Sequence, residues 1–238
     1  MLFNSYIFVF MFFPLVVLGY YGLHRLGWKS AALGYLTLMS MVFYGYNSFE
    51  YLIMLIVSIL VNYLLVRLMD KTSGMWRRSC LLVGLLYNLG ILFYFKYYDF
   101  FIENVNAVLD TDYHFLRLAL PLGISFYTFQ QISYVIDSYR GDCARYSFLE
   151  YAAYVSFFPQ LIAGPIVYHD ELIPQLRAQE NHHIQYENLN RGLYAFALGM
   201  AKKVLVADTL SKVVTAGYAN VEALNSVSTI MVMVCYAL

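Results

Sequence analysis

The side chains of this chain that could take part in proton transfer are five histidines and one aspartate in an apolar stretch. Histidine is the commonest general base in enzymes, because its pKa lies near neutral pH. None of the histidines falls within an apolar run, so we expect all five to be solvated loop residues. Adjacent histidines on a helix would point to different faces, which disfavours a metal pair. The histidines are His24, His114, His169, His182 and His183. The sequence therefore shows no recognisable catalytic base and no metal site.

Asp137 is the acidic residue that could have a function, because it lies near the end of the apolar stretch 121–141. An ionisable side chain near the bilayer interior is costly, so it pairs with another group or faces water. Arg140, three residues later, would lie on the same helix face and could pair with it. An ion pair at the membrane surface and a place in a cavity wall therefore remain alternatives.

The elements that position Asp137 lie between Pro121 and Tyr168. Pro121 and Gly123 open the first half of this stretch, and the second half carries Pro159 and then Gly164-Pro165 within one apolar run. Proline removes a backbone donor and breaks or kinks a helix. Irregular backbone at membrane depth survives only where protein or a water-filled cavity satisfies it. We therefore expect kinked or re-entrant segments that line a cavity.

The composition predicts an all-α polytopic membrane protein. Of the 238 residues, 61% are hydrophobic and only 13% charged, far from the balance of a soluble domain. Fifteen basic and fifteen acidic residues leave no net charge, which argues against a nucleic-acid partner. The three cysteines are widely spaced and are expected to be reduced packing residues.

Four spans precede the stretch 121–168. They are predicted at residues 3–23, 31–46, 49–69 and 79–98. The first lacks a basic start and a cleavage site, so we expect it to be an uncleaved span. Basic residues follow the first and third spans, and the acidic loop 99–114 follows the fourth. The positive-inside rule then places the N-terminus outside the cytoplasm.

The remaining segments are less uniform. Residues 169–188 are polar and predict a surface loop or a short interfacial helix, and residues 189–206 predict an amphipathic helix with Asn188 as its N-cap. Lys202 and Lys203 could anchor this helix at the interface or attract an anionic cofactor or lipid phosphate, and both interpretations stay open. Residues 227–238 begin an apolar run too short to span, so we expect the chain to be truncated.

Several strings resemble the membrane-bound O-acyltransferase family. They are PLGISFYTFQQISYVIDSYRG (121–141), SFFPQLIAGPIVY (156–168) and GMAKKVLVADTL (199–210), with weaker support from LFNSYIFVFMFFPLVVLGYY (2–21) and LGILFYFKYYDF (89–100). The similarity is to the branch of alginate O-acetyltransferases and D-alanyl-teichoic-acid transferases. It implies a funnel-like helical bundle, of which residues 1–238 form a single membrane domain corresponding to the N-terminal half.

The resemblance also implies an activity. Such enzymes sit in the bacterial cytoplasmic membrane and bind no cofactor. They transfer an acyl group, here expected to be acetyl, from a cytoplasmic thioester to an exported polysaccharide or cell-envelope hydroxyl. The thioester is acetyl-CoA or an acyl-carrier protein, and a periplasmic partner protein often takes part. The family's catalytic histidines would lie beyond Leu238, so we expect this chain alone to be inactive.

The resemblance implies roles for individual residues only by their positions in the matched strings. The candidates for a tunnel lining are Ser125, Tyr127, Gln130, Asp137, Pro159, Gln160, Gly164 and Pro165. Lys202 and Lys203 would face the donor side, and no residue of the chain is a catalytic candidate. Two alternatives remain: a transporter or channel subunit, since broken helices and an intramembrane acid suit that class, and a membrane scaffold that binds a periplasmic partner through residues 169–188.

Overall fold

The computed structural model describes residues 3–161, 164–165 and 167–237, and within these ranges it contains helices and connecting segments but no strand. The all-α fold predicted from the composition is confirmed. The chain divides into two compact units, residues 13–183 and the residues before and after them. Each unit is described by itself below. The prediction of one membrane domain over residues 1–238 stays a prediction.

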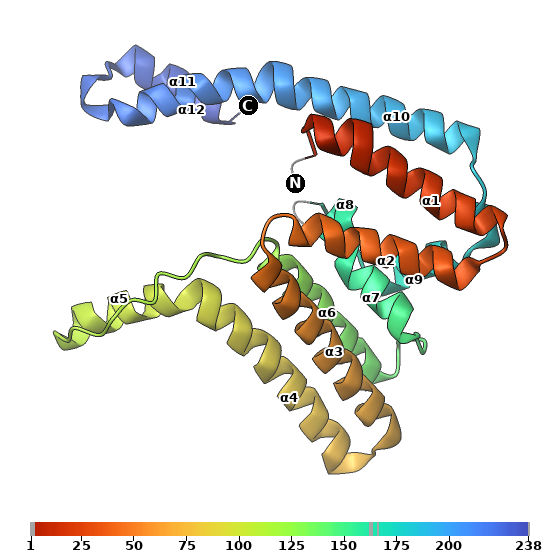
Figure 1. Ribbon diagram of the computed structural model, residues 1–238. Helices are drawn as coiled ribbons and strands as arrows, with labels where there is room; N and C mark the ends of the chain where they lie inside the picture. Colours follow the sequence, from red (N-terminus) through yellow and green to blue (C-terminus); the bar gives the residue numbers. More distant parts are fainter. Residues whose placement is uncertain (1–2, 162–163, 166, 238) are drawn as a thin grey trace. The chain divides into compact units, whose positions relative to one another are not determined.

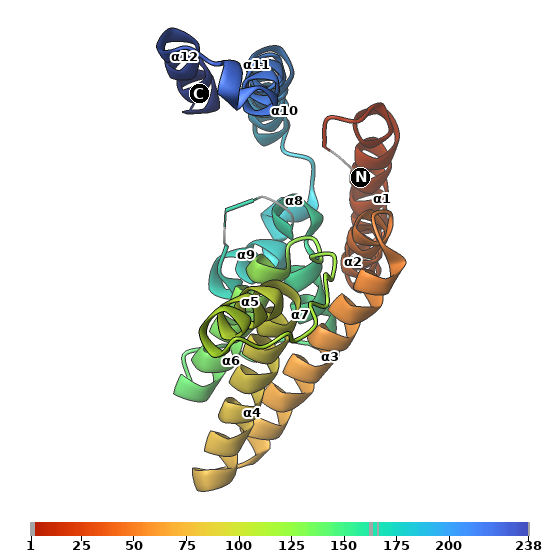
Figure 2. The same cartoon turned by 90° about the vertical axis from the view of Figure 1, so that its left-hand side faces the viewer.

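The larger unit is a bundle of long and short helices (Figures 1 and 2). Helices α3, α4 and α6 lie side by side, and α2 packs against α1 and α7. The helices are α1 (Phe13–Arg25), α2 (Lys29–Gly45), α3 (Phe49–Lys71), α4 (Gly74–Leu92), α5 (Tyr98–Leu109), α6 (Ile124–Arg140), α7 (Phe148–Ser156), α8 (Phe158–Leu161) and α9 (His169–Arg177).

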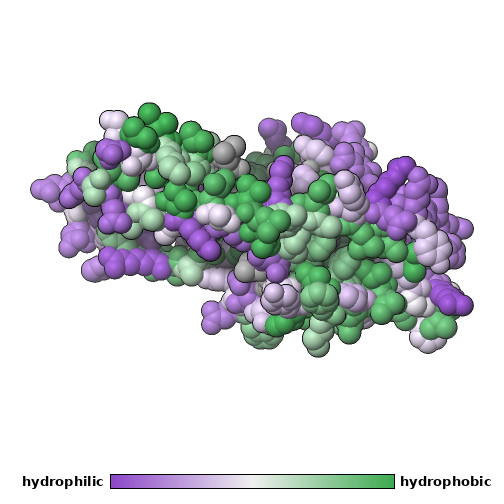
Figure 3. Space-filling model, turned by 90° about the horizontal axis from the view of Figure 1, so that it is seen from above, coloured by the Kyte–Doolittle hydropathy of each residue, from purple (hydrophilic) through white to green (hydrophobic). Residues whose placement is uncertain are grey.

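Three helical segments of the described residues are long and apolar enough to cross a membrane: Phe8–Arg25, Phe49–Lys71 and Gly74–Leu109. They overlap three of the four predicted spans, and the remaining one corresponds to α2, which has 17 residues. Apolar side chains cover broad areas of the surface visible in Figure 3. A soluble protein would not expose so much apolar surface. The chain is a multi-pass membrane protein, as predicted.

A buried layer of amides and one hydroxyl joins α3, α4 and α6. Ser58 Oγ donates to Gln131 Oε1 over 2.8 Å, and Asn88 Nδ2 donates to Asn62 Oδ1 over 2.6 Å. Asn62 Nδ2 in turn donates to the same Gln131 oxygen. All four side chains are buried. Because a buried polar group is costly without a partner, these bonds fix the register of the three helices.

The acidic loop predicted over residues 99–114 is wrong for its first part, because α5 occupies Tyr98–Leu109. The carboxylate of Asp99 at the start of α5 accepts the backbone N–H groups of Leu116 and Arg117 at 2.8 and 2.9 Å. Arg117 has a φ of 48°, an uncommon left-handed conformation that these bonds hold in place. Asp99 therefore fixes the extended segment that leads back to α6.

The predicted break within the apolar run 151–168 is confirmed at Phe157, where α7 has ended and α8 has not begun. Pro159 is the second residue of α8, in a first turn where a missing N–H costs little. Gly164 lies against α8, because a side chain there would bring its Cβ within 2.5 Å of Gln160 Cα. Residues 162, 163 and 166 of this predicted re-entrant stretch lie outside the described residues.

An ion pair ties α7 to α9. Arg177 on α9 donates to both oxygens of Glu150, over 2.6 Å from Nε and 3.0 Å from Nη2. Glu150 also accepts the backbone N–H of Ser147, completing a capping box at the start of α7. Of the two alternatives predicted for residues 169–188, a surface loop and a short helix, the structure shows a short helix, α9, packed on α7 and followed by a 3-10 turn at Gln179–His182.

The Glu150–Arg177 pair predicts a pH dependence of stability. The hydrogen bond from Arg177, with those from Ser147, lowers the pKa of Glu150 from 4.5 to about 2. Because the folded-state pKa is depressed, this stabilisation is fully present above pH 4.5 and is lost as the pH falls towards 2. Glu150→Gln should lower the free energy of unfolding by about 1 kcal/mol at neutral pH, through the weakened cap and pair.

Thermal unfolding of both proteins in detergent over this pH range measures the effect. The gap between wild type and Glu150→Gln should close as the medium becomes acid, and Glu171→Gln, an exposed acid on α9, serves as control. A gap that stays constant down to the lowest pH would contradict the assignment.

The smaller unit contains α10 (Tyr186–Ala201), α11 (Asp208–Ala219) and α12 (Ser226–Ala237). A π-helical turn at Lys202–Ala207 joins the first two. The predicted helix over residues 189–206 is confirmed, but it begins at Tyr186, so the N-cap is Gln185 and not Asn188. Helices α11 and α12 form a hairpin in which Gly217 lies against Val232 without room for a side chain.

Candidate functional site

The most enclosed histidine of the described residues is His169, the first residue of α9. It is 3% exposed, and three tyrosine rings surround it, those of Tyr134, Tyr146 and Tyr154, with ring centroids 5.7, 5.6 and 6.2 Å away. The prediction that His169 is a solvated loop residue is wrong. The apolar run ends just before it in sequence, but the tyrosines come from α6, α7 and the loop between them.

Both ring nitrogens of His169 have partners. Nε2 lies 3.0 Å from Oδ2 of Asp137, and Nδ1 lies 3.0 Å from the hydroxyl of Tyr146. Ser133 Oγ also donates to Asp137 Oδ2 over 3.0 Å. Since Asp137 as a carboxylate only accepts, the hydrogen-bond network assigns the proton to Nε2, with Nδ1 accepting from Tyr146. The hydrogen-bond partner of Asp137 is therefore His169 and not Arg140.

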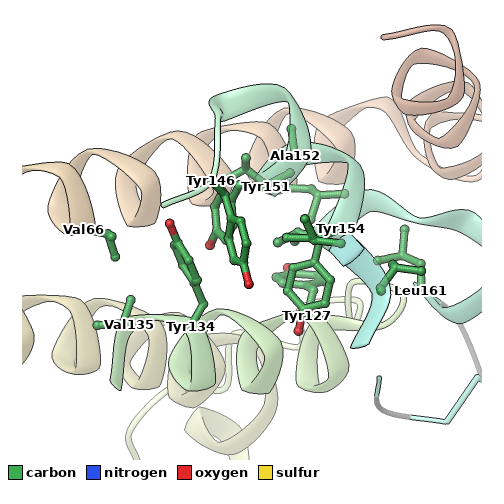
Figure 4. Packing of buried hydrophobic residues seen from close by; sticks show 14 of the residues in the cluster. Val66, Tyr127, Tyr134, Val135, Tyr146, Tyr151, Ala152, Tyr154 and Leu161 are labelled. Carbon is green, nitrogen blue, oxygen red and sulfur yellow. The ribbon is translucent and has the colours of Figure 1, made fainter. Parts of the chain in front are cut away.

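Packed tyrosines hold this chain of hydrogen bonds in place (Figure 4). The ring of Tyr134 on α6 stacks on Tyr151 at 4.4 Å and on Tyr146 at 5.9 Å between centroids. Burial raises the pKa of the Tyr146 hydroxyl, which therefore stays protonated and can donate to His169. Stacked rings with little rotamer freedom give Asp137 a fixed position.

Asp137 also forms part of the wall of a pocket of about 350 Å³ between α6, Tyr154 and Tyr168, here called the Asp137 pocket. Its polar lining includes Gln130, Ser133 and Arg140, and its remaining wall is aliphatic and aromatic. A mostly apolar pocket with a few convergent polar groups is the usual form of a small-molecule site. Asp137 thus lies in a cavity wall, the alternative to the surface ion pair in the sequence analysis, while it bonds a buried histidine.

The structure gathers only some of the predicted tunnel residues. Gln130 and Asp137 line the Asp137 pocket, whereas Pro159 lines a separate apolar pocket of about 310 Å³ formed by α1, α2, α8 and α9. Tyr127 and Gln160 are buried, and Gln160 Nε2 donates to the carbonyl of Tyr154 over 2.9 Å. Their role as tunnel lining stays a prediction.

The other candidates lie elsewhere. Ser125 accepts a hydrogen bond from Lys96 Nζ over 3.2 Å near the start of α6. Gly164 is partly exposed and Pro165 exposed. Lys202 and Lys203 belong to the smaller unit, where both are exposed and Lys203 pairs with Asp208. The prediction that these two lysines face the acyl donor stays a prediction.

Two further histidines are also not solvated. The rings of His24, at the end of α1, and His182 stack with centroids 4.1 Å apart, and both are buried. His114 and His183 are exposed, as predicted. The buried histidines were missed because each lies at the end of an element, where sequence alone does not show what packs on it. Among the described residues, no three potential metal ligands converge.

The sequence has significant matches to a protein family and to curated proteins. Residues 138–238 match the sequence model of MBOAT, the membrane-bound O-acyltransferase family. The chain is 34% identical over 265 residues to a peptidoglycan O-acetyltransferase of Helicobacter pylori, which covers 100% of this chain and 50% of the relative. The chain is therefore similar to the membrane-bound O-acyltransferase family, through the sequence model that residues 138–238 match and through this relative. The resemblance found in the sequence strings is confirmed.

Other members of the family give a similar result. The probable alginate O-acetylase AlgI of Pseudomonas aeruginosa is 34% identical over 220 residues, which is 89% of this chain and 41% of that protein. The protein of the same name from Azotobacter vinelandii is 35% identical, with 90% and 43% covered. The chain spans about half the length or less of these curated relatives. No solved structure gives a significant match.

Proposed function

We propose that this chain forms the N-terminal part of an O-acetyltransferase that modifies a cell-envelope or exported polysaccharide. The observation that carries the proposal is the hydrogen bond of Asp137, which lines the Asp137 pocket, to the buried His169, in a chain whose relatives are named for O-acetylation. The donor would be a thioester, acetyl-CoA or an acyl-carrier protein, presented from the cytoplasm. The acceptor would be a hydroxyl beyond the membrane, delivered with the help of an extracytoplasmic partner.

The chemistry of such a transfer limits what these residues need to do. The acceptor oxygen attacks the thioester carbonyl, a base takes its proton, and the thiol leaves. A thioester is already activated, so the enzyme needs only to position the two reactants and to supply one base for the acceptor hydroxyl. His169 is not that base in our proposal, because both its nitrogens already have partners. Asp137 and His169 are instead positioning residues that keep the wall of the pocket rigid.

The orientation follows the distribution of charge. The end of α3 and the start of α4 carry Arg67, Lys71, Arg77 and Arg78, and we propose that this end faces the cytoplasm, with the N-terminus outside. The C-terminal end of α6 lies at the same end, because Arg77 bonds the carbonyls of Ser138 and Tyr139. Asp137 would then lie near the cytoplasmic, donor side of the bacterial cytoplasmic membrane.

Acetyl transfer by the full-length protein in proteoliposomes tests the proposal. Radiolabelled acetyl-CoA outside vesicles of cytoplasmic-side-out orientation should label a polysaccharide acceptor, with the partner supplied inside. Residues 1–238 alone should give no transfer above background. Transport of an ion or solute by the full-length protein without any acetyl transfer would contradict the enzyme assignment.

Gly164 provides a sharper test of the broken segment. A side chain there must displace the backbone of Gln160, so in the full-length protein Gly164→Leu should abolish transfer while leaving membrane insertion intact. Gly90→Leu is the matched control, because Gly90 is exposed on α4 with nothing near its Cβ position. Full activity of Gly164→Leu would exclude this segment from the site.

A further inference from the structure

A second polar pocket of about 280 Å³ is lined by Tyr134 and Tyr146, two of the tyrosines that contact His169. The end of α3, the start of α4, the end of α6 and the loop after α6 enclose it, and it is called the arginine pocket here. Its charged and polar lining consists of Arg67, Asp70, Arg77, Tyr134, Ser138, Cys143, Arg145 and Tyr146. Three guanidinium groups face a single carboxylate, so the pocket has an excess of positive charge.

Little within the pocket neutralises that charge. Arg145 and Asp70 approach only to 3.8 Å, and the Arg145 side chain is largely exposed, so this pair is weak. The guanidinium of Arg67 lies 5.4 Å from the ring centroid of Tyr63, and that of Arg77 lies 5.5 Å from the ring of Tyr139. These contacts orient the groups without removing their charge.

Two buried hydrogen-bonding groups of the pocket also have no partner. Arg77 Nη2 donates to the carbonyls of Ser138 and Tyr139 over 3.1 and 2.7 Å, which fixes the guanidinium, but its Nε has no acceptor. The hydroxyl of Ser138, a residue 9% exposed, likewise has no partner in good hydrogen-bond geometry among the residues that the structure describes. Unpaired buried donors are costly, and an anion that accepts from them would remove the cost.

We propose that the arginine pocket binds a phosphate group. Arginine forks match phosphate oxygens with paired, charge-assisted hydrogen bonds, and the excess of positive charge suits a dianion. A water-soluble phosphate compound, such as the phosphate-bearing part of a thioester donor, and the headgroup of an anionic phospholipid share this chemistry. The donor as source rests on the proposed function, whereas phosphate binding itself does not.

The pocket is also coupled to the candidate site. Tyr134 and Tyr146 line the arginine pocket and contact His169. Nε2 of His169 in turn bonds Asp137, which lines the Asp137 pocket. A bound phosphate would therefore lie one residue layer from the Asp137 pocket. In the proposed enzyme this arrangement would hold a phosphate of the acyl donor near the cytoplasmic side, while the thioester end of the same donor extends to the site of acetyl transfer.

Binding is tested with the full-length protein in nanodiscs of neutral phosphatidylcholine, titrated with inorganic pyrophosphate in a calorimeter. Saturable binding is expected, weakened about ten-fold in Arg67→Gln and in Arg145→Gln by loss of a charge-assisted contact. Arg78→Gln is the matched control, since Arg78 neighbours Arg77 but is exposed and lies outside the pocket. Arg67 and Arg145 are chosen because Arg77 also holds the end of α6.

Two additional arms distinguish the sources. Competition of pyrophosphate by coenzyme A supports the water-soluble source, and phosphatidylglycerol that co-purifies with wild type but not with Arg67→Gln supports the lipid. The proposal would be overturned if the wild type bound neither pyrophosphate nor phosphatidylglycerol. It would also be overturned if the wild type and the three variants bound them equally. None of these measurements needs turnover, so a failed acetyl-transfer assay leaves them interpretable.

Discussion

Replacing His169 with alanine should reduce acetyl transfer by the full-length protein by at least about ten-fold. The variant removes the partner of both Asp137 and Tyr146 and leaves a carboxylate and a hydroxyl beside an empty space. Orphaning a polar group away from water costs about 1–3 kcal/mol, which corresponds to factors of about five to about 150. We expect the loss in kcat rather than in the KM for the donor, because His169 positions the wall of the site and does not touch the reactants.

The measurement compares initial rates of acetyl transfer for wild type, His169→Ala, His169→Gln and His183→Ala. Glutamine can bond both Asp137 and Tyr146 without titrating, so His169→Gln should recover much of the rate if the role is positioning. His183 is exposed and serves as control. If His169→Gln is as inactive as His169→Ala while both proteins fold, the positioning role is wrong. If His169→Ala is fully active, the pair lies outside the site.

The elements of the chain could be predicted because they depend on local patterns. The third predicted span, 49–69, agrees with α3 within two residues, since a long apolar segment between Ser48 and a basic end needs no tertiary information. The break near Pro159 was predicted for a similar reason, because proline limits the backbone wherever it lies. The predicted start of α10 was wrong because asparagine is a common N-cap residue and glutamine is not. The sequence therefore favoured Asn188, whereas the N-cap in the structure is Gln185.

The site could be predicted only in part, because it depends on which elements meet. Asp137 was singled out by its charge in an apolar stretch, but the one partner that its spacing suggested was Arg140, on the same helix. The partner is His169, which is 32 residues away, and its burial comes from tyrosines on other elements. Tyr134 and Tyr146 gave no signal, since the chain has 24 tyrosines and most apolar stretches contain one.

The polar layer between α3, α4 and α6 was missed for the same physical reason. Asn62 and Asn88 are single amides in two apolar helices, and Gln131 is one of two adjacent glutamines in a third, so each alone resembles a tolerated substitution. Only the packing of the three helices shows that these amides form hydrogen bonds with one another. An amide within a predicted span therefore deserves a search for amides in the other spans, because polar side chains inside a bilayer seek partners.

Asn62→Leu should destabilise the larger unit by about 2–3 kcal/mol, the largest stability effect that we expect in the bundle. Leucine has a similar size, so the packing changes little. However, Asn88 loses a partner, and Gln131 loses one of its two donors. Gln131 Nε2 already lacks a partner, so the remaining amides cannot easily form a new network.

Unfolding of the purified protein by a denaturing detergent measures the change, with Asn104→Leu as control because Asn104 is exposed on α5. A double-mutant cycle of Asn62→Leu and Asn88→Leu separates the pair from its surroundings. We expect the double variant to lose clearly less than the sum of the single variants, since it removes both polar groups and leaves neither unpaired. Additive losses would show that the two amides do not bond each other. A single variant as stable as wild type would show that water or lipid satisfies this layer, and α3, α4 and α6 would then owe their register to apolar packing alone.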